Sequence, residues 1–144
     1  MAGQTLFDRI VAGEIPSHKV AEGDDWYAFL DIYPRRKGHT LVIPKRGVSH
    51  ISMLNDHETK SLFDGMKQVQ SILSKHFRTN DFTICIHDGK LAGQEVPHVH
   101  IHVIPRTVKD GGLTLMSMWP KGGPIGGDAN HKLLAMLSEK LREV

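Results

Sequence analysis

The feature that most constrains the fold of this chain is a strict alternation of histidine with aliphatic residues at 98–104. These residues read His-Val-His-Ile-His-Val-Ile. Successive side chains of a β-strand point to opposite faces, so the three imidazoles share one face and the aliphatic side chains share the other. Threonine, lysine or glutamate usually fill a solvated strand face, so a face of histidines indicates chemistry. We expect a half-buried strand over 96–104 whose imidazoles form part of a site.

Apolar residues at helical spacing predict three helices. A short helix over 6–11 follows Thr5 as its N-cap, and a longer one of about two dozen residues follows a capping-box pattern at Asn55. The chain from Val108 to Gly127 is rich in glycine and is expected to be irregular. A last helix begins at Asp128 and carries leucines on one face.

Three further segments have the composition of strands. They are rich in β-branched or aromatic residues and cover 26–32, 39–43 and 82–87. The connections are too short for parallel crossovers, so we expect an antiparallel sheet of about five strands in an α+β fold, with one long and two short helices. One domain over 1–144 is expected, with its motif-bearing core at about 4–106.

Composition excludes several classes of function. The 18 basic and 16 acidic residues are spread along 144 positions and show no basic cluster, so no nucleic-acid partner is expected. No apolar run approaches the roughly 20 residues of a membrane span, and the first residues do not resemble a secretory signal. We expect no membrane association and a cytoplasmic location, or a nuclear one. The single cysteine, Cys85, is expected to be a buried core thiol.

Two chemistries suit three imidazoles on one face. Histidines two positions apart on a strand can bind Zn²⁺, with a further ligand and an open coordination position for catalysis. Alternatively, one neutral imidazole attacks phosphorus while its neighbours orient it and donate hydrogen bonds to the phosphate. Both chemistries need an imidazole that is neutral near pH 7, and the residues alone leave both open.

The histidine run resembles the histidine triad motif, His-φ-His-φ-His-φ-φ with φ apolar, of the HIT superfamily of nucleotide hydrolases and transferases. Further blocks of the chain look like the family's blocks and follow the same order. They are residues 6–10, 13–16, 29–34, 38–45 and 92–96. The resemblance is to Hint-like or bacterial-type members and implies the HIT fold and a homodimer.

This resemblance implies roles for four histidines. His100, the middle histidine of the triad, is the expected nucleophile, which attacks the α-phosphorus of an adenylyl substrate and forms an AMP–histidine intermediate. His102 is expected to contact the phosphate and the leaving group. His98 and His39 are expected to orient the nucleophile through an imidazole network.

The resemblance also implies a set of nucleotide-binding residues. The purine ring is expected to lie among four apolar side chains, which are Phe7, Ile10, Phe29 and Ile32. Asp31 is expected to accept hydrogen bonds from the ribose hydroxyls. The phosphate is expected beside His87, Gln94, Glu95 and Val96. His87 is a departure, since the Hint branch has an asparagine there and the Fhit branch a glutamine. Glu95 replaces a hydroxyl residue, so its carboxylate is expected to point away from the phosphate.

The implied activity is hydrolysis of purine nucleoside phosphoramidates, in which AMP is joined to an amine or to lysine. Zinc-bearing family members carry cysteines and a histidine where this chain has Thr5, Asp8 and Gly47, so no structural zinc is implied. We expect no metal and no cofactor. The alternatives are a Fhit-like dinucleoside polyphosphate hydrolase, a metallohydrolase whose ligands are the triad, and a nucleotide- or partner-binding protein with incidental turnover.

Overall fold

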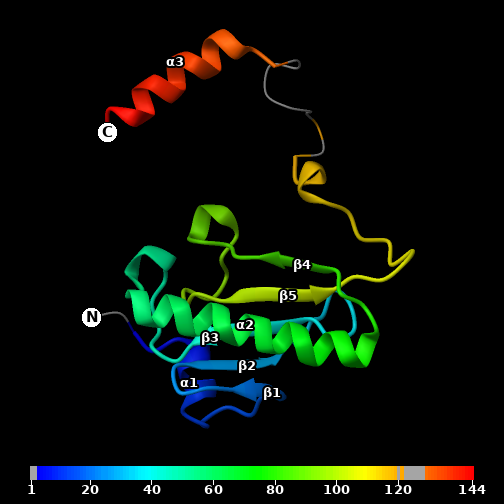
Figure 1. Ribbon diagram of the computed structural model, residues 1–144. Coiled ribbons are helices and arrows are strands. Elements are labelled where there is room, and N and C mark those ends of the chain that lie inside the picture. The colour runs from blue at the N-terminus through cyan, green and yellow to red at the C-terminus, as the bar shows by residue number, and fades with distance from the viewer. Residues whose placement is uncertain (1–2, 120, 122–128) are drawn as a thin grey trace. The chain divides into compact units, whose positions relative to one another are not determined.

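A computed structural model describes residues 3–119, 121 and 129–144 of the chain (Figure 1). The chain divides into two units, Met1–Asp110 and Gly111–Val144. The expectation of one domain over 1–144 and that of a homodimer both stay predictions. Within the described residues, no helix is both long enough and apolar enough to cross a membrane.

The first unit contains a five-stranded antiparallel sheet, which confirms the expected fold. Its strands lie in the order β1-β2-β3-β5-β4. Their bounds are β1 Lys19–Glu22, β2 Trp26–Leu30, β3 Thr40–Pro44, β4 Phe82–Cys85 and β5 Ile101–Pro105. The edge strand β1 was not predicted. It is short and half-exposed, so it lacks the aliphatic run that marked the other strands.

The strand that carries the histidines begins later than predicted, at Ile101 instead of residue 96. Pro97 has no N–H to give to a ladder. The His98 N–H donates to the Val96 carbonyl at 2.7 Å, and the Val99 N–H donates to the Val48 carbonyl in a loop at 2.7 Å. The main chain before Ile101 therefore bonds to loops, and His98 and His100 precede the strand.

Two other predicted strands are shorter than expected because they end where the chain turns to form a site. β2 ends at Leu30 instead of residue 32, and the Asp31 N–H donates to the His39 carbonyl at 2.9 Å. β4 ends at Cys85 instead of residue 87. Asp31 and His87 thus lie just beyond the ends of strands. Their side chains do not have to follow the alternating up-and-down directions of a strand.

A helix packs on each of the two faces of the sheet. Helix α2, Asp56–Phe77, crosses one face (Figure 1), and there it packs on the fully buried Val99, Ile101 and Val103. Helix α1, Leu6–Val11, packs on the other face, where it meets side chains of β2 and β3 such as Phe29 and Leu41. The predicted aliphatic face of the triad segment is confirmed as core. The triad imidazoles consequently lie on the side of α1.

The predicted helix caps are confirmed for the first two helices. Thr5 and Asp8 form a capping box on α1, and Asn55 and Glu58 form one on α2. In the second unit, helix α3 spans His131–Arg142 and its N-cap is Asn130, whose side chain accepts the Leu133 N–H. The predicted cap Asp128 lies outside the described residues.

Candidate active site

A cavity of about 790 Å³ lies over the sheet face that α1 covers, and it collects most of the predicted site residues. Eleven of the thirteen contribute to its lining. They are Phe7, Ile10, Phe29, Asp31, Ile32, His39, His87, Glu95, Val96, His100 and His102. The other two, His98 and Gln94, are buried behind the cavity wall.

His100 is held so that one ring nitrogen is free. Its Nδ1 lies 2.7 Å from the main-chain carbonyl of His98, which can only accept a hydrogen bond. Nδ1 therefore carries the proton. Burial lowers the pKa of His100 below its usual value, so the ring is neutral near pH 7. The neutral tautomer leaves the lone pair on Nε2, and this nitrogen can act as a nucleophile toward a ligand in the cavity.

A chain of hydrogen bonds fixes the tautomer of His102. The Arg35 backbone N–H donates to Nδ1 of His39 at 3.1 Å, so a neutral His39 carries its proton on Nε2. This Nε2 lies 2.9 Å from Nδ1 of His102 and donates to it. His102 is then left with its proton on Nε2. The ring centroids of His102 and His100 are 5.0 Å apart and both rings line the cavity, so the ring next to the nucleophile carries a hydrogen-bond donor.

Burial also dominates the charge state of this cluster. It lowers the pKa of His39. Burial, together with the neighbouring imidazoles of His100, His39 and His87, lowers the pKa of His102 to about 4. Four imidazoles packed together cannot all be protonated at low cost. His39, His100 and His102 are therefore neutral at pH 7, and a bound phosphate would raise the pKa of whichever of them it contacts.

An aromatic wall stands beside the nucleophile. The ring of Phe7, from α1, meets the rings of Phe29 and His100 edge-on at centroid distances of 5.4 and 5.2 Å. Two residues after Phe29, just beyond the end of β2, Asp31 lines the cavity and its Oδ1 accepts the Tyr33 N–H at 2.8 Å. Its Oδ2 lies 3.6 Å from Nε2 of His39. An apolar slot and a carboxylate thus flank the imidazoles.

The segment proposed as a phosphate loop is divided between two roles. Gln94 does not line the cavity, and its side-chain amide donates to the Ser49 carbonyl at 2.7 Å. Glu95 and Val96 do line it. His87 also lines the cavity, with its ring 5.4 Å from that of His102. Gln94 therefore holds the loop in place, and the two residues after it line the cavity.

Sequence reasoning missed several lining residues. Cys85 is only half-buried and lines the cavity, so its assignment as a buried core thiol was wrong. It pairs with His102 across β4 and β5, a register that the sequence does not specify. Arg35 lines the cavity from the turn between β2 and β3. The cationic run in that turn is the signal that would have found it.

Three of these side chains have the residue types of a metal site. Asp31, His39 and His102 each offer one ligand atom, and these atoms lie within 4.8 Å of one another. A cation would need both nitrogens of the His39–His102 hydrogen bond, so metal binding competes with that bond. The expectation of no metal stays a prediction.

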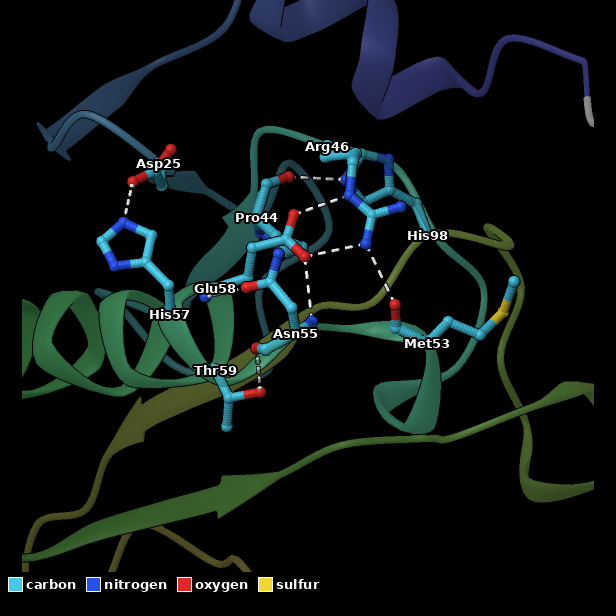
Figure 2. A network of polar contacts seen from close by, with 9 residues as sticks. All are labelled: Asp25, Pro44, Arg46, Met53, Asn55, His57, Glu58, Thr59 and His98. Atoms are coloured by element: carbon cyan, nitrogen blue, oxygen red, sulfur yellow. Dashed lines mark hydrogen bonds and ion pairs between the residues drawn. The ribbon is translucent and has the colours of Figure 1, made fainter.

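His98 is anchored behind the cavity by a segment that is itself clamped to α2. Its Nε2 lies 2.8 Å from the Pro44 carbonyl (Figure 2). Two residues later, Arg46 forms a two-pronged ion pair with Glu58 at 2.7 Å and donates to the Met53 carbonyl at 3.0 Å. Figure 2 shows Arg46 spanning these partners. The pair lowers the pKa of Glu58 to about 2. The start of α2 thereby fixes the strand end that supports His98.

We expect Glu58→Gln to lower the free energy of unfolding by about 1–2 kcal/mol at pH 7, because it removes a charge-assisted, nearly buried pair with a partly exposed arginine. The low pKa of Glu58 makes this stabilisation complete above the usual pKa of 4.5 and lost as the pH falls toward 2. Urea unfolding of both proteins at several pH values measures it. Asp64→Asn, which removes an exposed pair with Lys60, is the matched control with an expected effect below about 0.5 kcal/mol. A Glu58→Gln effect as small as the control's contradicts the clamp.

Comparison with known proteins agrees with this geometry. Residues 12–109 match the model of the HIT domain family. An adenosine 5′-monophosphoramidase of Schizosaccharomyces pombe is 34% identical over 137 residues, which cover 95% of this chain and 98% of that protein. A bis(5′-nucleosyl)-tetraphosphatase (asymmetrical) of the same organism is 43% identical over 83 residues, which cover 58% of this chain and 46% of that protein.

A solved structure extends the agreement to the whole fold. A HIT-family protein of Bacillus subtilis superposes with a TM-score of 0.81 at 31% sequence identity, covering 99% of this chain and 98% of that one. The family match spans the triad, His39 with the β3 strand that follows it, and the loop before the triad, which build much of the cavity, while the lining residues of α1 precede the match. The chain belongs to the HIT family, whose members include hydrolases of nucleotide substrates.

Proposed function

We propose that this protein hydrolyses purine nucleoside phosphoramidates, in which AMP is joined to an amine or to lysine, through a covalent AMP–histidine intermediate. The observation that carries the proposal is the orientation of His100. Its Nδ1–H is engaged by the His98 carbonyl, so the lone pair of Nε2 is available in a nucleotide-sized cavity. The 34% identity to an adenosine 5′-monophosphoramidase over nearly both chains supports the choice of substrate.

The proposed reaction has two steps. Nε2 of His100 attacks the α-phosphorus, which forms an N–P bond and breaks the P–N bond to the leaving amine. The amine must take up a proton as it leaves. A bound phosphate raises the pKa of the imidazole that it contacts, so His102 can be protonated in the complex, donate this proton to the amine and return to its neutral form. Water then attacks phosphorus and gives a proton to His102, the bond to His100 breaks, and AMP departs. The hydrogen bonds that fix His39 and His102 before substrate arrives reduce the reorganisation that the first step requires.

The remaining lining residues fit the nucleotide. Phe7 and Phe29 offer an apolar slot for the purine, and Asp31 offers a carboxylate for the ribose hydroxyls. Residues 93–96 offer main-chain groups for the phosphate. A second candidate, hydrolysis of dinucleoside polyphosphates, uses the same nucleophile with an anionic leaving group, and the similarity to a tetraphosphatase favours it as the alternative. Arg35 in the lining would suit such a leaving group.

Intact-protein mass spectrometry tests the proposal. The protein is mixed with adenosine 5′-phosphoramidate, quenched without acid, and digested to map the adduct while free AMP is followed. We expect one acid-labile AMP group on His100. His131→Ala, which removes an exposed histidine of α3, is the control and should form the adduct normally.

Each contrary result points to a different function. Faster turnover of diadenosine tetraphosphate than of the phosphoramidate would favour the alternative hydrolase. Loss of activity in EDTA together with stoichiometric bound metal would favour a metallohydrolase on Asp31, His39 and His102. AMP binding with neither adduct nor turnover would favour a binding protein.

A further inference from the structure

The hydroxyl of Thr5 connects the start of α1 with the histidine behind the nucleophile. Thr5 is the N-cap of α1, and its Oγ1 accepts the Asp8 N–H at 3.0 Å. The same oxygen lies 2.9 Å from Nδ1 of His98. One side chain therefore serves both a helix cap and a contact with the triad.

The other ring nitrogen of His98 sets the direction of this hydrogen bond. Nε2 faces the Pro44 carbonyl, an acceptor, so Nε2 carries the ring proton. Because burial lowers the pKa of the fully buried His98, the ring holds no second proton near pH 7. Nδ1 then has a lone pair, and the hydroxyl of Thr5 is the donor. The Asp8 carboxylate accepts the Thr5 backbone N–H at 2.8 Å and also lies 3.1 Å from the Thr5 hydroxyl, so it competes with His98 for the single hydroxyl proton. The contact with Nδ1 of His98 is the shorter of the two, at 2.9 Å, and this nitrogen has no other donor among the described residues.

The main chain at Gly47 lies close to the hydrogen bond between Thr5 and His98. A Cβ atom on Gly47 would lie 2.5 Å from Oδ1 of Asp8 and 2.9 Å from Nδ1 of His98. Glycine is therefore required at this position by the close approach of the loop. Thr5, Asp8 and Gly47 together surround the Nδ1 edge of His98, and both nitrogens of the ring are engaged.

We propose that Thr5 is a positioning residue for the nucleotide transfer, because its hydroxyl holds the His98 ring and thereby keeps the His98 carbonyl aimed at the Nδ1–H of His100. The inference rests on the proposed function. Phe7, two residues further along α1, packs edge-on against the rings of both His98 and His100 at 5.7 and 5.2 Å. Helix α1, which contributes Phe7 to the apolar slot proposed for the purine, thus also supports the nucleophile.

Three substitutions separate positioning from helix capping. Thr5→Ser keeps the cap and the donor, Thr5→Val removes both, and Thr5→Asp restores a capping acceptor but has no proton to donate. For adenosine 5′-phosphoramidate we expect kcat to fall about ten-fold in Thr5→Val and in Thr5→Asp, with KM within about two-fold, and to stay within about two-fold in Thr5→Ser. The melting temperature should recover in Thr5→Asp. Recovery of kcat along with it, or a loss confined to KM, would show a role in capping or binding alone and overturn the proposal.

Nitrogen-15 NMR of the histidine rings tests the hydrogen-bond direction without substrate. We expect His98 to carry its proton on Nε2 in the wild type and in Thr5→Ser. A proton on Nδ1 would make Thr5 an acceptor and contradict the inference. If the wild type does not turn over the phosphoramidate, the proposed function fails on that result alone, and the NMR spectrum still decides how Thr5 and His98 are bonded.

Discussion

His100→Gln is expected to lower kcat for adenosine 5′-phosphoramidate by about 10⁴-fold, with the Kd for AMP unchanged within about three-fold. Glutamine can still donate to the His98 carbonyl, so the wall of the cavity keeps its hydrogen bond. It has no nitrogen lone pair that can attack phosphorus. The loss therefore falls on the chemical step and leaves ground-state binding intact.

Single-turnover kinetics with calorimetric AMP titration measure both quantities. His102→Gln is the comparison, because it removes the imidazole that can protonate the leaving amine while leaving the nucleophile in place. We expect it to cost about 10²-fold in kcat, the usual scale for loss of one positioned donor or acid. A His100→Gln enzyme that keeps more than a tenth of the wild-type rate would require direct attack by water and would remove the covalent intermediate from the mechanism.

The second large effect is a loss of stability in mild acid. Burial lowers the pKa values of four imidazoles, those of His39, His98, His100 and His102. The unfolded chain therefore binds protons near pH 6.5 that the folded chain does not bind. Where the unfolded state binds more protons, stability falls as the pH falls. The pKa of His102, lowered to about 4, alone corresponds to about 3 kcal/mol lost between pH 7 and pH 4. The other three add losses of the same sign.

Urea unfolding followed by fluorescence of the buried Trp26 measures this loss at a series of pH values. His102→Gln carries no titrating ring there, so the dependence of its unfolding free energy on pH should be shallower than that of the wild type. The imidazoles lose their contribution to stability in a higher pH range than Glu58 does, because the stabilisation from Glu58 is lost only below the usual carboxyl pKa. A wild-type unfolding free energy that stays constant from pH 7 to pH 5 would show that the imidazoles are protonated in the folded protein.

Local signals were sufficient for most of the fold. The period-two pattern correctly placed Val99, Ile101 and Val103 in the core. Thr5 as an N-cap and the capping-box pattern at Asn55 correctly marked the starts of α1 and α2. Both signals depend on neighbours within a few residues, so a single sequence contains them. The strand bounds were less well predicted. Whether residues 96–100 join the ladder depends on Pro97 and on a carbonyl of Val48 that packing brings alongside.

The candidate site divides in the same way. Local motifs and the family resemblance named eleven of the residues that line the cavity, but they assigned Cys85 to the core and placed Gln94 with the phosphate. The Cys85 side chain faces the cavity because β4 pairs with β5 in one particular register. The Gln94 amide is taken by a carbonyl in a loop forty-five residues earlier. Register and loop contacts of this kind arise from the packing of distant segments, which no local pattern encodes.

The sequence by itself determined that the three imidazoles share one face and the neighbouring aliphatic side chains the other, and through its motifs that the chain belongs to the HIT family. It placed those imidazoles in similar local environments, with Pro97 and Val99 beside His98 and an aliphatic residue on either side of His100 and His102. Only the tertiary structure made them different. His98 is bound by Thr5 and Pro44, His100 by the His98 carbonyl, and His102 by His39. The tautomer of an imidazole follows from whether each partner donates or accepts, and most of these partners come from distant parts of the chain.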